Sequence, residues 1–210
     1  MNITALRPRL IQYLAPVARL FYRAGITPNQ ISVLSLLCGL GCAYLFYTRN
    51  FPWGSLLLVL SATLDLIDGS VARMGKRETN FGAVFDWITD KYVDAFALIG
   101  IGFSGIPVIS HFWNVPSLFD FGVVAIAITG SLMNTFIKPV VYAEVGFKER
   151  VEGKIEDPLE GVGFFGRPET ILALAVGGLT GLIGIAVILI AVCTHLSALE
   201  RIIYLYRRIG

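Results

Sequence analysis

The chain has 210 residues, of which 55% are hydrophobic and 15% are charged, and its mean hydropathy is +0.71. Soluble domains carry roughly 25% charged residues, so this composition argues against a soluble globular protein and indicates an integral membrane protein. The formal net charge of +2 predicts no nucleic-acid partner. We expect a single membrane domain over residues 1–210, with no cleavable signal peptide at its start.

The first segment, residues 4–24, mixes apolar side chains with four arginines. Its apolar residues recur at helical spacing, which predicts a basic amphipathic helix lying on the membrane surface. A flexible basic tail is the alternative. Gly25 ends this helix, and Thr27-Pro28-Asn29 predicts a cap for the helix that follows.

Long apolar runs predict an all-α bundle of six membrane-spanning helices between about residues 29 and 207. The first four are expected at about 29–48, 53–73, 82–103 and 118–143. A charged loop is expected at 144–166. The 40 residues from 168 to 207 exceed one span, so we expect a short fifth helix, a turn near the glycines at 177–181, and a sixth helix. These glycines could instead lie inside tightly packed helices.

Lysine and arginine gather on one side of this arrangement. With six spans, the two termini, the loop after the second span and the charged loop share a side that holds most of the 17 basic residues. The opposite side holds only Arg49. Because basic residues are enriched in cytoplasmic loops, we expect both termini and the inner ends of the second and third spans to face the cytoplasm.

Four aspartates lie at those inner ends, in the stretch DLIDGSVARMGKRETNFGAVFDWITD, residues 65–90. Spacings of three and four residues place Asp65 with Asp68, and Asp86 with Asp90, on one face of each helix. If the two helices are antiparallel, all four carboxylates converge and require a cation among them. Carboxylate oxygens without His or Cys suit a hard cation such as Mg²⁺, Mn²⁺ or Ca²⁺.

Small and basic residues accompany these aspartates. Gly69 and Gly82 would allow a ligand or a second backbone to approach closely, and Arg73 could meet a phosphate. The alternative is that the carboxylates are solvated at the membrane surface or paired with Arg73 and Lys91. An ionisable side chain inside a span costs ~2.5–3.5 kcal/mol and is functional by default, so we favour the metal site.

The complete pattern, Asp65-x2-Asp68-Gly69-x2-Ala72-Arg73-x8-Gly82-x3-Asp86-x3-Asp90, resembles the signature of the CDP-alcohol phosphotransferase family, and every fixed position is filled. The resemblance implies an enzyme in which the hydroxyl of a small alcohol displaces CMP from a CDP-linked lipid, in phospholipid biosynthesis. It also implies Mg²⁺ or Mn²⁺ as cofactor, with two ions, and a homodimer in the membrane. The donor lipid could be diacyl or archaeal diether.

The same resemblance assigns roles to the residues of the signature. The metal ligands would be Asp65, Asp68, Asp86 and Asp90, and Asp90 would also be the general base. The CDP group would be held by Asp65, Asp68, Gly69, Ala72, Arg73 and Gly82. Asp94 lies outside the signature, and we expect it to be a structural charge paired with Lys91.

Two further segments resemble the branch of this family that uses inositol phosphate. They are Phe136-Ile137-Lys138 and the GRPE run around Arg167. We expect Lys138, Arg150 and Arg167 to bind the acceptor, and we favour a phosphorylated polyol. At two positions where that branch typically has arginine, this chain has Val140 and Thr170, so glycerol 3-phosphate and serine stay open as acceptors.

A different class of protein, a divalent-cation transporter, could also use an acidic cluster. Transport would favour carboxylates near the bilayer midplane and polar residues continuing to the far side. Here the far halves of the spans are apolar, so the enzyme is preferred. Binding of a cytidine nucleotide would separate the two classes.

Overall fold

The computed structural model describes residues 7–75, 79–145, 150–151, 154–155, 159 and 161–209. This part of the chain forms seven helices: α1 (Arg7–Arg23), α2 (Pro28–Tyr47), α3 (Phe51–Gly75), α4 (Asn80–Phe103), α5 (Leu118–Val145), α6 (Arg167–Thr180) and α7 (Ile183–Ile209). Two antiparallel two-residue strands, β1 (Arg150–Val151) and β2 (Lys154–Ile155), lie between α5 and α6. The predicted helical fold is confirmed, and this short pair is an addition within the expected loop at 144–166.

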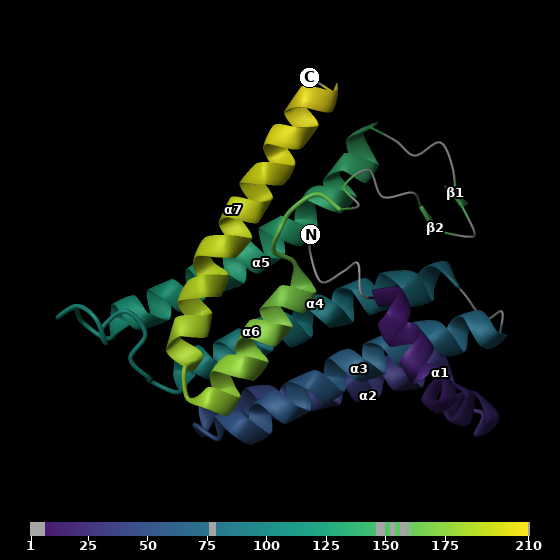
Figure 1. Ribbon diagram of the computed structural model, residues 1–210, viewed down its shortest axis with the longest axis horizontal. Coiled ribbons are helices and arrows are strands. Elements are labelled where there is room, and N and C mark those ends of the chain that lie inside the picture. Colours follow the sequence, from purple (N-terminus) through teal and green to yellow (C-terminus); the bar gives the residue numbers. More distant parts are fainter. Residues whose placement is uncertain are drawn as a thin grey trace.

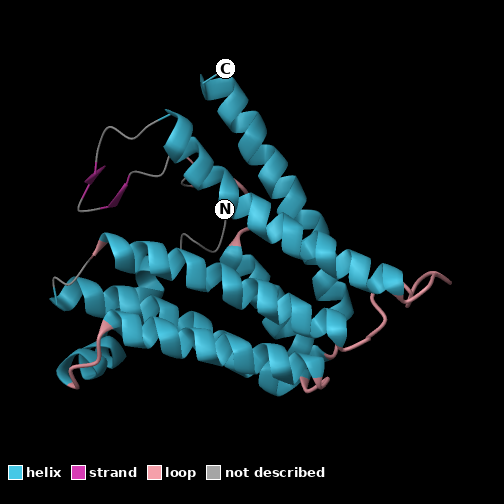
Figure 2. Ribbon diagram, turned by 180° about the vertical axis from the view of Figure 1, so that it is seen from behind, coloured by secondary structure: helices cyan, strands magenta, loops and turns pink. Residues whose placement is uncertain are grey.

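The helices form two groups, which are joined through α6 and by the packing of α4 against α5. Helices α2, α3 and α4 run side by side, and α2 packs against both of the others (Figure 1). Helices α5 and α7 form a second pair, which rises away from the first group toward the C-terminus (Figures 1 and 2). The short α6 packs against α3 on one side and α7 on the other, and α1 crosses the end of α3.

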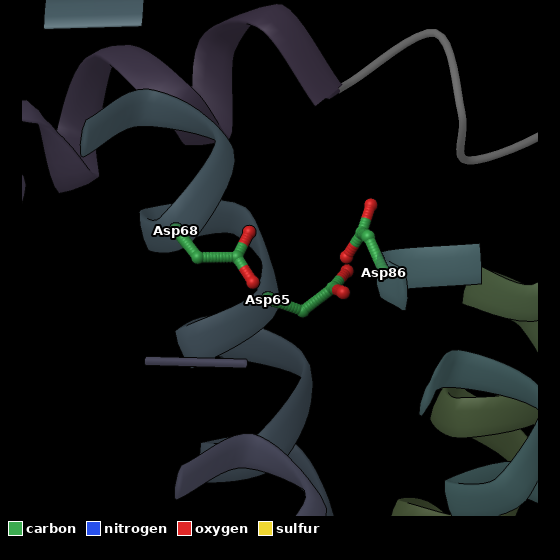
Figure 3. A group of neighbouring side chains, drawn as sticks. All are labelled: Asp65, Asp68 and Asp86. Atoms are coloured by element: carbon green, nitrogen blue, oxygen red, sulfur yellow. The ribbon is translucent and has the colours of Figure 1, made fainter. Parts of the chain in front are cut away.

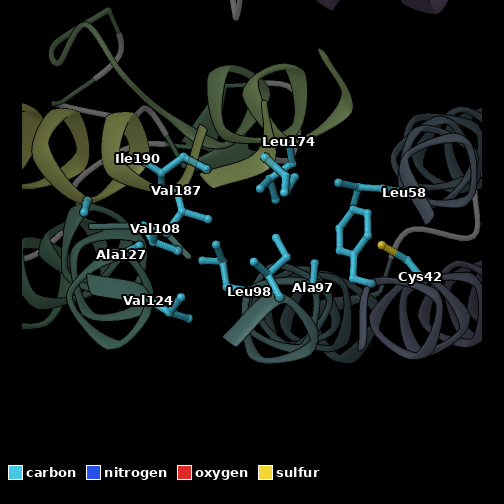
Figure 4. Packing of buried hydrophobic residues seen from close by; sticks show 14 of the residues in the cluster. Cys42, Leu58, Ala97, Leu98, Val108, Val124, Ala127, Leu174, Val187 and Ile190 are labelled. Atoms are coloured by element: carbon cyan, nitrogen blue, oxygen red, sulfur yellow. The ribbon is translucent and has the colours of Figure 1, made fainter. Parts of the chain in front are cut away.

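A continuous apolar core joins the two groups. It contains Phe46 from α2, Leu58 from α3, Leu98 from α4, Leu174 from α6 and Ile190 from α7, all almost fully buried (Figure 4). A smaller cluster places Ala18 of α1 against the end of α3. In lipid the helices gain little from apolar burial alone, so close van der Waals packing holds such a bundle together.

Two glycines allow backbones to touch at helix crossings. A Cβ atom on Gly100 of α4 would lie 2.2 Å from the carbonyl oxygen of Ala43 on α2. A Cβ atom on Gly178 of α6 would lie 2.0 Å from Ser55 Oγ and 3.0 Å from the carbonyl oxygen of Phe51, both at the start of α3. Small residues at these points therefore fix the spacing of α2, α4, α3 and α6.

The predicted helix boundaries near the glycines and prolines are confirmed. Thr27 caps α2 in a capping box with Gln30, and Pro28 opens the helix. Gly181 has φ 77° at the C-terminus of α6, the left-handed conformation that glycine adopts readily, and the chain turns there into α7. The alternative placement for Gly177 and Gly178 also holds, because both are buried inside α6.

Four helices are long and apolar enough to cross a membrane: α2, α3, α5 and α7. Helix α4 has sufficient length, but it carries four charged side chains, Asp86, Asp90, Lys91 and Asp94. Helix α6 has 14 residues, about 21 Å, which is shorter than the ~30 Å hydrocarbon core. The chain is thus an integral membrane protein with at least these four candidate spans, and a six-span arrangement stays a prediction.

The segment expected at residues 4–24 is helical over α1, Arg7–Arg23, whereas residues 4–6 lie outside the described part, and its place on the membrane surface stays a prediction. Only Ala18 is buried, and Tyr13 and Leu20 are exposed together with the arginines. This helix thus presents apolar and basic side chains outward, as an interfacial helix does.

The ends of α3 and α4 remote from the aspartates are braced by polar contacts. The guanidinium of Arg49 donates to the carbonyl oxygens of Ser104 and Gly105, which joins the α2–α3 turn to the end of α4. Asp120 accepts bonds from the backbone N–H groups of residues 108–110 and so orders the loop before α5. These contacts hold the scaffold that presents the aspartate cluster at the other end.

Candidate active site

The predicted convergence of the aspartates is confirmed for three of them. Asp65 and Asp68 lie one turn apart on α3, and Asp86 lies in the second turn of α4. One carboxylate oxygen of each lies within 4.8 Å of those of the other two. Figure 3 shows the three side chains pointing toward one another from the two helices.

The chemistry of this trio fits a divalent metal ion. Asp68 is 5% exposed, and Asp65 and Asp86 are partly buried. Their negative charges repel one another at these distances, so the arrangement needs positive charge to be stable. Because the ligand atoms are all carboxylate oxygens, a hard ion that prefers oxygen would fit between them.

Asp90 lies one turn beyond Asp86 on α4 and forms an ion pair with Arg167. Its Oδ1 lies 2.8 Å from Nη2 of Arg167, in an ion pair whose angle is not that of a hydrogen bond. Arg167 Nη1 lies 2.8 Å from Asp65 Oδ2, and its Nε lies 3.3 Å from Asp94 Oδ1. Asp94 also pairs with Lys91 at 2.9 Å, as the sequence predicted.

The backbone before Arg167 is anchored by polar residues that the sequence analysis did not assign to the site. Asn134 of α5 donates to the carbonyl oxygen of Phe165 at 2.6 Å, and Ser197 of α7 accepts from the Phe165 N–H. Arg201 of α7 donates to the carbonyl oxygens of Val162 and Asn134. These contacts fix where α6 begins, and hence where Arg167 enters the cluster.

A sequence signal for Arg201 did exist. It is an ionisable residue in a long apolar run, which favours a functional or structural partner over a solvated charge. Arg201 is only 7% exposed, whereas Arg207 and Arg208, near the end of the same helix, are exposed.

The residues expected to hold the CDP group continue along α3 from the trio. A Cβ atom on Gly69 would meet only the guanidinium of Arg73, at 3.5 Å, so no backbone or core atom fills that space. Ala72 is partly buried, and Arg73 is exposed and donates to Ser70 Oγ. Gly82 lies in the first turn of α4, where its N–H donates to Thr79 Oγ1.

The three residues expected to bind the acceptor lie in different settings. Arg167 is inside the aspartate cluster, with its side chain 17% exposed. Lys138 is partly buried near the end of α5. Arg150 belongs to β1, and its side chain lies outside the described part. The structure brings only the first of them to the carboxylates within the described residues.

Comparison with known proteins agrees with the signature. Residues 25–197 match the CDP-alcohol phosphatidyltransferase family. Since this match covers most of the chain and includes all four aspartates, the protein belongs to that family and is a transferase.

Individual relatives extend the comparison. The archaetidylinositol phosphate synthase of Pyrococcus horikoshii is 26% identical over 200 residues, which cover 95% of this chain and 94% of that protein. The CDP-diacylglycerol–glycerol-3-phosphate 3-phosphatidyltransferase of Cereibacter sphaeroides is 40% identical over 84 residues, which cover 38% of each.

A solved structure shares the fold. The phosphatidylinositol phosphate synthase of Mycobacterium tuberculosis with CDP-DAG bound has a TM-score of 0.72 at 21% identity, covering 93% of this chain and 94% of that one. The same protein has also been solved with manganese and citrate, again with a TM-score of 0.72.

Proposed function

We propose that this enzyme transfers a phosphatidyl-type group from a CDP-linked lipid to a hydroxyl of a phosphorylated polyol such as inositol phosphate, releasing CMP. The observation that carries the proposal is the group of three facing carboxylates, Asp65, Asp68 and Asp86, within the family's signature. The near full-length similarity to an archaetidylinositol phosphate synthase supports the acceptor class. No observation favours the transporter alternative.

The signature residues divide the chemistry between them. A divalent ion at Asp65, Asp68 and Asp86 would neutralise the diphosphate and stabilise the leaving CMP. Manganese in a protein of the same fold supports Mn²⁺ or Mg²⁺, and we propose two ions with Asp90 as a further ligand. The open space at Gly69 lets the diphosphate approach α3, where Arg73 can pair with a phosphate oxygen.

Asp90 takes the proton of the acceptor hydroxyl in this proposal. The hydroxyl oxygen forms a bond to the lipid-bearing phosphorus, the bond from that phosphorus to the CMP oxygen breaks, and CMP leaves with the electron pair. The base must reach the hydroxyl directly or through one water. Asp90 is partly buried one turn from Asp86, next to the trio but outside it, which suits this role.

Lys138, Arg150 and Arg167 are proposed to hold the acceptor phosphate. Arg167 is the best supported because it lies beside Asp90. The phosphate would compete with carboxylates for its guanidinium, since planar donors suit both groups. We further propose six spans, with α4 and α6 shielded by their neighbours, both termini in the cytoplasm, and a homodimer.

The test uses purified protein in detergent with Mn²⁺ and either CDP-diacylglycerol or its diether analogue. CMP release is followed on adding inositol 1-phosphate, glycerol 3-phosphate, serine or inositol in turn. We expect release with inositol 1-phosphate and its loss with EDTA. Release driven only by glycerol 3-phosphate or serine would overturn the acceptor assignment, and CMP binding without any release would point to another donor.

A matched pair of variants links the activity to the site. Asp86→Asn removes one carboxylate of the trio, and Glu200→Gln removes an exposed carboxylate on α7. We expect the first to abolish CMP release and the second to leave it unchanged.

A further inference from the structure

Arg167 lies among the aspartates and pairs with three of them. Each of its three guanidinium nitrogens lies near a different carboxylate, those of Asp65, Asp90 and Asp94, at 2.8, 2.8 and 3.3 Å. Asp94 is buried, and the Arg167 side chain is 17% exposed. At such burial the interaction of these charges is screened far less than on the surface.

The position of Arg167 is set by hydrogen bonds at the start of α6 and in the segment before it. It is the first residue of α6, and Glu169 accepts a bond from the N–H of Gly166 just before it. Asn134, Ser197 and Arg201 hold the preceding backbone. The guanidinium is thereby held between α3 and α4.

The carboxylates form two overlapping sets. Asp65, Asp68 and Asp86 have oxygens within 4.8 Å of one another, and Arg167 contacts Asp65 from this set. The second set is Asp65, Asp86 and Asp90, whose charges are close enough to repel one another. Arg167 pairs with two members of this second set, Asp65 and Asp90. The guanidinium thus pairs with one member of the first set and with two members of the second.

We propose that Arg167 takes the place of a second divalent ion, so that the substrate-free protein binds one ion tightly at Asp65, Asp68 and Asp86. A second ion would use Asp90 only when the guanidinium leaves that carboxylate. A positive charge a few ångströms away repels a divalent ion strongly in a partly buried site, and the same contact occupies an oxygen that the ion needs. This inference rests on the proposed metal-dependent function, and it makes Arg167 a positioning residue that controls when Asp90 becomes available.

The experiment is a Mn²⁺ titration of the purified full-length protein in detergent without substrate, with bound and free Mn²⁺ counted by electron paramagnetic resonance. In the wild type we expect one ion per chain at low concentration and a second only at much higher concentration. In Arg167→Gln the second ion should bind at least about tenfold more tightly than in the wild type. Arg207→Gln removes the same charge from an exposed site on α7 and should reproduce the wild type.

Two further variants keep the test decisive. Arg167→Gln/Asp90→Asn removes both partners of the pair and should bind only the first ion, which locates the second ion at Asp90. If Arg167→Gln does not fold, Arg167→Lys retains the charge, but a compact ammonium cannot bridge two carboxylates as a guanidinium does. The second ion should then also bind more tightly than in the wild type.

Two equal Mn²⁺ sites in the wild type, or a second site unchanged in Arg167→Gln and Arg167→Lys, would overturn this inference and leave the proposed function intact. Failure of the wild type to bind any Mn²⁺ would instead overturn the metal-dependent function itself, and this inference with it.

Discussion

The hydroxyl of Ser32 on α2 donates a 2.5 Å hydrogen bond to Oδ2 of Asp68 on α3. Ser32 is 5% exposed and lies outside the family signature, so a buried residue of a neighbouring helix orients one of the three facing carboxylates. Groups that bond to a metal ligand fix its orientation and tune its affinity, and their loss typically costs 10–100-fold in metal affinity.

Ser32→Ala should therefore weaken the binding of the first Mn²⁺ ion by about tenfold. The matched control is Ser35→Ala, one turn further along α2. Ser35 is equally buried, but its hydroxyl bonds to Ser61 and not to an aspartate. The control should lower thermal stability without changing the dissociation constant for Mn²⁺. Equal effects of the two variants on Mn²⁺ affinity would show that Ser32 acts only through packing.

Replacing Gly100 with alanine should destabilise the contact between α4 and α2. The added Cβ would lie 2.2 Å from the carbonyl oxygen of Ala43, and a backbone atom cannot move aside as a flexible side chain can. Overpacking of this kind costs about 1–3 kcal/mol. Thermal unfolding in detergent should show a lower midpoint for Gly100→Ala.

The control for that variant is Gly122→Ala in α5, where no atom lies within 4 Å of the added Cβ. Alanine favours a helix over glycine by up to about 1 kcal/mol, so its midpoint should stay the same or rise. A wild-type midpoint for Gly100→Ala would mean that α4 and α2 are not in close backbone contact at this point.

Arg201→Met should loosen the backbone that leads into α6. The substitution keeps a long apolar stem but leaves the carbonyl oxygens of Val162 and Asn134 without this donor, and an unsatisfied buried group costs about 1–3 kcal/mol. Hydrogen exchange at residues 161–166 should become faster. Arg207→Met on the exposed side of α7 serves as control, and slow exchange in both variants would contradict the anchoring role.

The sequence predicted well those features that depend on residues close together along one helix. The spacing of Asp65 and Asp68, the pairing of Lys91 with Asp94 and the turn after α6 all follow from local periodicity or from glycine and proline positions. Helix boundaries agree within a few residues, because each apolar run is bounded by polar or turn-forming residues. The convergence of Asp86 with the first pair required only that two consecutive helices be antiparallel.

Contacts between remote segments could not be predicted in this way. Arg167 lies 102 residues from Asp65, and periodicity gives no information on which carboxylates a distant arginine will meet. The bond from Ser32 to Asp68 and the anchoring by Arg201 likewise depend on how α2 and α7 pack. The sequence identified Arg167 as a site residue through resemblance, but its ion pairs with the aspartates became visible only in the folded chain.

The most direct test of the account is the rate of CMP release by the wild type and by Asp90→Asn, with CDP-linked lipid, inositol 1-phosphate and Mn²⁺. Asp90 lies outside the group that would hold the first ion, so Asp90→Asn should fold and bind that ion with wild-type affinity. Loss of a general base typically lowers the reaction rate about 10²–10⁴-fold, so we predict a fall in kcat of at least about 100-fold. EDTA should abolish the activity of the wild type. Full activity of Asp90→Asn, or CMP release that persists in EDTA, would contradict the assignment of this aspartate cluster as the catalytic centre.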